Sequence, residues 1–249
     1  MERETTSGRT FRWKRQTIAV LLFGISFGYV EAAVVTYLRP QFYAVRTTFT
    51  RPSHDPLPML SAQQVRAVGP DMGRTVRTEV GREAATLLML GAVAAAVGGS
   101  MARWLAFFLL AFGAWDISYY AFLKVLIDWP KSLLTWDVLF LIPVPWSGPV
   151  LAAGLVALTM VGTALVYLWR ESKYDLLGLR AVHWLGVGVG ALLILAAFTR
   201  DFRNVMAGGM PKPFAWPLFA LGEILWVWAF LHGMSTTGPS HSGRTRIRP

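Results

Sequence analysis

Six long apolar stretches constrain the fold of this chain more than any other feature. An α-helix rises 1.5 Å per residue, so about 20 apolar residues cross a hydrocarbon core about 30 Å thick. Stretches of this length lie at residues 17–38, 82–99, 104–127, 148–169, 181–199 and 214–233. Charged residues make up only 15% of the chain and cluster between the stretches. The sequence therefore predicts an all-α fold, a polytopic transmembrane helix bundle of about six spans, as a single domain over residues 17–233.

Two connections between the predicted spans stand out. Residues 39–81 form the longest one, which is expected to be a loop whose pattern becomes helical from Ser61 onward. Residues 132–146 are apolar but too short to cross a membrane, and two prolines interrupt their end. They are expected to form a short re-entrant segment after a turn at Asp128. Irregular backbone at membrane depth persists only where protein buries it or where it lines a wet cavity.

The net charge of +10 comes mainly from basic residues in the tails and loops. Basic residues at these places set topology and attract anionic lipid headgroups, so we expect the tails to contact lipid and do not expect nucleic-acid binding. Residues 1–16 are expected to form a basic cytoplasmic tail, and residues 234–249 a basic disordered one. Six spans then place both termini in the cytoplasm.

The chain contains no cysteine, which excludes disulfides, iron–sulfur clusters and thiolate zinc sites. No common nucleotide, hydrolase or zinc-protease motif occurs, and no cofactor is predicted. His183 and His232 fall near the ends of the last two spans. They are interpreted as interfacial histidines rather than as haem ligands.

Carboxylates inside the predicted spans are the strongest functional feature of the sequence. Asp116 and Glu223 fall near the middle of the third and sixth spans, and Glu31 falls toward the outer end of the first. A carboxylate that faces lipid at the centre of a span costs about 2.5–3.5 kcal/mol. These side chains are therefore expected to face protein or water.

Helical spacing predicts which way the polar residues face. Asp116, Tyr120 and Lys124 recur four residues apart, as one stripe on the third span. Gly24 and Gly28 form a small-residue face of the first span that continues to Glu31, so Glu31 is expected to point into the bundle. The predicted ligand-binding residues, lining one cavity that opens opposite the tails, are Glu31, Glu83, Asp116, Tyr120, Lys124, Asp137 and Glu223.

Two other interpretations of the same carboxylates remain open. They could pair structurally with basic residues at the same level, namely Arg77, Arg82, Lys124 or Arg200. Alternatively, Glu31, Asp116 and Glu223 could hold a hard metal cation, although the chain lacks the Glu-x-x-His signature of di-iron bundles. No metal site is predicted.

Three stretches, "GYVEAAVV", "GREAATLLML" and "DWPKSLLTWDVLFLIPVPWSGPV", make up about a sixth of the chain. In these stretches the chain resembles an uncharacterised family of bacterial multi-pass membrane proteins. The resemblance implies a bacterial cytoplasmic membrane and implies no activity or site residue.

Three function classes fit these observations. The first is a protein that binds or transports a small solute, proton or cation through buried carboxylates. The second is a non-catalytic subunit of a larger membrane complex, whose carboxylates would face outward to partner subunits. The third is a membrane-embedded acid–base enzyme acting on a lipid, so the sequence leaves open whether the protein is an enzyme.

Overall fold

The structure is a computed structural model that describes residues 3–46, 61–173, 180–207, 209 and 211–236. Six of its helical segments are long and apolar enough to cross a membrane, so the predicted all-α bundle of six spans is confirmed. The chain is a multi-pass membrane protein. The spans are Trp13–Pro40, Pro70–Gly98, Met101–Ile127, Val150–Lys173, Ala181–Met206 and Trp216–Thr236.

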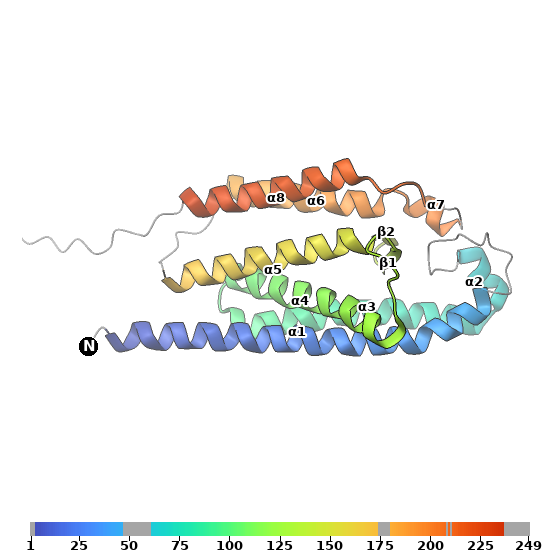
Figure 1. Cartoon of the computed structure of the whole chain (residues 1–249), viewed down its shortest axis with the longest axis horizontal. Helices are drawn as coiled ribbons and strands as arrows, with labels where there is room; N and C mark the ends of the chain where they lie inside the picture. The colour runs from blue at the N-terminus through green and yellow to red at the C-terminus, as the bar shows by residue number, and fades with distance from the viewer. Residues whose placement is uncertain (1–2, 47–60, 174–179, 208, 210, 237–249) are drawn as a thin grey trace, which may run out of the picture.

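The helices lie side by side along the long axis of the molecule (Figure 1). Helix α4 (Met101–Ile127) packs against α1 (Arg3–Arg46), α3 (Pro70–Gly98) and α5 (Val150–Lys173). Helices α6 (Ala181–Thr199) and α8 (Trp216–Thr236) form an antiparallel pair that contacts α5, and the short α7 (Phe202–Met206) precedes α8. The beginning of α1 and the end of α8 lie at the same end of the bundle, as an even number of crossings requires.

Small residues bring α1 and α4 close together. A Cβ atom added to Gly24 would lie 2.8 Å from the carbonyl oxygen of Ala111, and one added to Gly28 would lie 2.8 Å from that of Trp115. Backbones approach this closely only where side chains are absent. The prediction that the Gly24–Gly28 face contacts another helix is therefore confirmed.

The connection between the first two spans is more helical than the sequence predicts. Helix α1 continues to Arg46, residues 47–60 lie outside the described part, and α2 (Ala62–Val68) follows. Ser61 caps α2, because its hydroxyl accepts the Gln64 N–H at 3.3 Å while the Gln64 side chain accepts the Ser61 N–H at 2.8 Å. Helix α3 then begins at Pro70 instead of residue 82, because a helix can extend through polar residues beyond the apolar length of its span.

The basic ends of the chain differ in what the structure describes. Residues 3–16, expected to form a tail, continue α1 as a helix. Of the predicted disordered tail, residues 237–249 lie outside the described part.

The short segment between the third and fourth spans folds as a β-hairpin. Strand β1 (Trp136–Phe140) pairs antiparallel with β2 (Trp146–Pro149), with Asp137 opposite Gly148. The sequence predicts an irregular segment here but not its strands. The paired strands satisfy part of each other's backbone hydrogen-bonding groups, and whether the segment enters the membrane stays a prediction. A Cβ on Gly148 would lie 2.8 Å from the Phe198 ring, so the hairpin also packs against the end of α6.

Candidate functional site

The protein has a cavity of about 1020 Å³. Several elements that line it, namely α2, the hairpin and α7, lie toward the end of the bundle away from the start of α1 and the end of α8 (Figure 1). The cavity wall comes from α1, α2, α3, α4, the hairpin and α7. The carboxylates in the wall are Glu31, Glu79, Glu83, Asp116 and Asp137, and the arginines are Arg39, Arg66, Arg77 and Arg82. Aromatic and aliphatic side chains form the rest. The result is a large cavity with many charges inside a membrane protein.

Five of the seven predicted ligand-binding residues line this cavity. They are Glu31, Glu83, Asp116, Tyr120 and Asp137. The other two, Lys124 and Glu223, are not in the cavity wall that the structure describes. Lys124 is exposed and donates to Asp128 Oδ1 at 2.6 Å, because the predicted stripe runs past the end of the cavity at this point.

Glu31 and Arg82 join α1 to α3. Glu31 is only 3% exposed and accepts a hydrogen bond from Thr86 Oγ1 at 2.5 Å. It also forms an ion pair with Arg82, whose Nε donates to Glu79 Oε2 at 2.9 Å. One guanidinium is thus shared by two carboxylates, so this group keeps a formal charge of −1.

Two further hydrogen bonds join the hairpin to α4 and α3 beside the cavity. The Tyr120 hydroxyl donates to Asp137 Oδ2 at 3.0 Å, and the Leu141 N–H donates to Glu83 Oε2 at 2.8 Å. Burial raises the pKa of the Asp137 carboxyl to about 6, against the opposing influence of Arg39 and the Tyr120 hydrogen bond. Each of these carboxylates therefore has a partner on a neighbouring element.

Asp116 differs from the other carboxylates because it has no partner. Among the described residues it forms neither a hydrogen bond nor an ion pair, and the nearby Asp137 carboxyl repels its charge. Gly28 packs against Trp115 and Tyr119, so Asp116 lies near the level of Gly28. Since Glu31 lies three residues further along α1, Asp116 is about 5 Å deeper than Glu31. Asp116 therefore forms the floor of the cavity.

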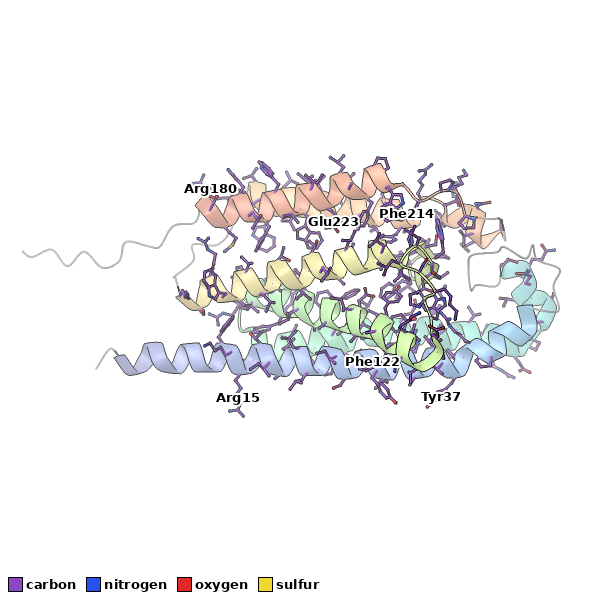
Figure 2. All side chains as sticks on the ribbon, in the orientation of Figure 1. Arg15, Tyr37, Phe122, Arg180, Phe214 and Glu223 are labelled. Carbon is purple, nitrogen blue, oxygen red and sulfur yellow. The ribbon has the colours of Figure 1, made fainter. Side chains whose placement is uncertain are left out.

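Glu223 lies elsewhere in the bundle. It points from α8 toward α5 in Figure 2, and Thr159 Oγ1 donates to its Oε2 at 2.6 Å. Its Oε1 is buried and has no partner among the described residues. Helix α5 contributes no residue to the described cavity wall, so Glu223 faces a different helix contact. A single cluster that joins Asp116 to Glu223 is therefore not what the structure shows.

Sequence reasoning missed several residues of the wall. The Arg39 guanidinium stacks on the Trp129 ring, 3.9 Å from its centroid, and both residues line the cavity together with Tyr119. Helical spacing could have found two of them. Arg39 follows Glu31 by eight residues and Tyr119 follows Asp116 by three, which are spacings of a shared helix face.

The structure also places the carboxylates considered as metal ligands and the two histidines considered as haem ligands. Glu31, Asp116 and Glu223 do not meet, and the described residues contain no group of three or more His, Asp or Glu side chains that could hold a metal ion. His183 Nε2 lies 3.1 Å from His232 Nδ1, so the two histidines join α6 to α8.

No family model, curated protein or solved structure matches this chain. The cavity and its charges are therefore the basis for a functional hypothesis.

Proposed function

We propose that this protein binds a small organic solute with a cationic group in its membrane cavity, as a binding or transport protein, and that Asp116 is the counter-ion of that group. The observation that carries the proposal is the unpartnered Asp116 carboxyl at the cavity floor. A carboxylate kept only for structure is expected to be paired, as Glu31 is with Arg82. An unpaired carboxylate that is partly desolvated in a membrane cavity is costly, and a bound cation offsets this cost.

The size and walls of the cavity favour an organic solute over a bare ion. Pockets for small organic molecules usually measure about 300–1,000 Å³, and this cavity measures about 1020 Å³. A single metal ion would leave most of it empty. Trp115, Tyr119 and Trp136 line the wall, and aromatic faces attract organic cations such as ammonium groups.

The direction of the carboxylates favours this proposal over a non-catalytic subunit of a larger complex. Glu31, Glu83, Asp116 and Asp137 line an internal cavity, whereas a subunit that binds partner helices through its carboxylates needs them on its outer surface. An acid–base enzyme acting on a lipid remains the second alternative. It needs a reactive lipid group beside Asp116 or Asp137, so binding of a lipid there is what distinguishes it from a solute-binding protein.

We further propose that the protein resides in a bacterial cytoplasmic membrane with both termini in the cytoplasm. The sequence resemblance supports the bacterial membrane, and the five basic residues before residue 17 support the orientation. The cavity would then open on the outer side, and the basic cytoplasmic ends would contact anionic lipid headgroups. Such an arrangement suits capture of a solute from outside the cell.

The test is binding of organic cations to the purified protein in lipid nanodiscs. Tetraphenylphosphonium and a panel of primary and quaternary amines are the probes, and the melting temperature is the readout. A probe at a hundred times its Kd is expected to stabilise the wild type by about 2.7 kcal/mol. Asp116→Asn is expected to lose this effect.

The matched control is Glu223→Gln, which removes another intramembrane carboxylate that lies outside the described cavity wall. It is expected to keep the stabilisation by the probe. Equal stabilisation of the wild type and Asp116→Asn would contradict the proposal.

A further inference from the structure

Three arginines of the cavity wall have no carboxylate partner. Arg39, Arg66 and Arg77 come from α1, α2 and α3, and none forms an ion pair with a described residue. The fourth arginine of the wall, Arg82, does pair, with Glu31 and Glu79. A guanidinium stays charged, so three unpaired ones around one cavity form a strong positive field.

The helix register places two of these arginines near one level. The ion pair between Glu31 and Arg82 aligns the antiparallel helices α1 and α3. From this contact, Arg39 lies eight residues along α1 and Arg77 lies five residues back along α3. At 1.5 Å per residue these steps are about 12 Å and about 8 Å toward the mouth. Arg39 and Arg77 therefore lie on neighbouring helices, at levels within one helical turn of each other.

Contacts and exposure indicate that these three arginine side chains lie at the mouth of the cavity. Arg39 is fixed by stacking on Trp129, which itself lines the cavity. Arg66 and Arg77 are exposed and are also part of the cavity wall. The charge of Arg39 interacts with that of the Asp137 carboxyl, although the two form no ion pair. The mouth is therefore positive, while the floor at Asp116 is negative.

We propose that the mouth of the cavity is an oxyanion subsite in which Arg39, Arg66 and Arg77 bind a phosphate or carboxylate group of the solute. The arginine fork matches such groups because it donates two parallel N–H bonds to them. Asp116 lies about 12 Å deeper than Arg77 along the helices. The solute is therefore zwitterionic, with its anionic group at the mouth and its cationic group at the floor. The cationic half of this inference rests on the function proposed for Asp116.

The first experiment measures oxyanion binding alone. The full chain is placed in nanodiscs of phosphatidylcholine and titrated with inorganic phosphate and with hexyl phosphate. Arg39→Gln and Arg77→Gln are expected to weaken binding about tenfold each. Arg74→Gln is the matched control, since Arg74 lies on α3 outside the described cavity wall, and it is expected to bind as the wild type does. Absence of saturable binding, or equal binding by all four proteins, would overturn the oxyanion subsite.

The second experiment tests whether one solute spans both ends. Aminohexyl phosphate carries an amine that hexyl phosphate lacks, and it is expected to bind the wild type about tenfold more tightly. Asp116→Asn is expected to bind the two compounds equally while keeping its affinity for hexyl phosphate. If the amine adds nothing in the wild type, the zwitterionic solute and the role of Asp116 fail, while the oxyanion subsite stands.

A third arm separates a solute from a lipid headgroup as the source of the oxyanion. Phosphatidylglycerol is added to the nanodiscs, and the affinity for hexyl phosphate is measured again. An unchanged affinity is the expected result for a solute site. Competition by phosphatidylglycerol would assign the three arginines to a lipid phosphate and overturn the zwitterionic solute.

Discussion

The contact between Glu31 and Arg82 predicts an unequal effect of removing its two partners. The Glu31 side chain is 4% exposed and that of Arg82 is 25% exposed. Arg82→Gln leaves the buried Glu31 carboxylate with only the Thr86 hydroxyl as a donor among the described residues. Removing one partner of a buried pair costs about 3–5 kcal/mol. Because Arg82 is a quarter exposed, we expect the lower end, about 3 kcal/mol.

The reverse substitution, Glu31→Gln, is expected to cost much less. The glutamine oxygen can still accept the hydrogen bond from Thr86, and Arg82 keeps its ion pair with Glu79. The loss is then close to the low end of the range for one hydrogen bond to a charged group, about 1.5 kcal/mol. The double variant is expected to cost less than Arg82→Gln, since the buried Glu31 carboxylate is gone and only the less buried Glu79 carboxylate loses its partner there.

The assay is reversible unfolding in mixed micelles, with increasing denaturing detergent and tryptophan fluorescence as the signal. The free energies of unfolding of the wild type, the two single variants and the double variant form a double-mutant cycle. A cost of Glu31→Gln equal to or above that of Arg82→Gln would refute the reasoning. Additive single effects would refute it as well.

Three further predictions concern packing, the floor of the cavity and pH. Gly28→Ala is expected to destabilise the protein by about 1–3 kcal/mol in the same unfolding assay, because its Cβ meets the α4 backbone. The control Gly154→Ala, which meets no atom within 4 Å, is expected to be neutral or stabilising, and equal effects would contradict the α1–α4 packing. Asp116→Asn is expected to melt at the same temperature as the wild type or higher, since a charge without a partner is removed; a clear loss of stability would indicate a structural role. The Asp137 pKa is raised from 3.8 to about 6, so the folded protein keeps a proton between these values that the unfolded chain releases. The stabilisation that comes from this bound proton is therefore complete below about pH 4 and is lost as the pH rises through about 6. Asp137→Asn should flatten the curve of stability against pH between these values. An unchanged slope would contradict the assignment of this pKa to Asp137.

The number and place of the membrane helices could be predicted from the sequence because the length of an apolar run is a local property. The inward direction of Glu31 could be predicted for a similar reason. Gly24 and Gly28 mark a contact face three and seven residues before it, and the structure places that face on α4. Glu83 and Thr86 lie three residues apart, which is a spacing of one helix face, and both line the cavity.

What the sequence could not supply depends on contacts between distant segments. Spacing along α8 gives the neighbours of Glu223 but not the rotation of the helix, which turns this carboxyl toward Thr159 on α5. The hairpin forms because its two strands satisfy each other's backbone groups, and no periodic pattern marked either strand. Arg39 escaped notice because it follows the apolar run, although α1 continues as a helix beyond it.

The central claim is that water and cations reach Asp116 from the end of the bundle opposite the termini. The chain has no cysteine, so Asp116→Cys introduces a single thiol into the protein. Proteoliposomes of known orientation are treated with a membrane-impermeant trimethylammonium methanethiosulfonate, added to one side at a time. Ile117→Cys is the control, since the Ile117 side chain is 37% exposed on α4 outside the described cavity wall.

We predict rapid modification of Asp116→Cys from the side opposite the termini and little modification of Ile117→Cys from either side. An unreactive thiol at position 116, or one that reacts only from the side of the termini, would contradict the claim.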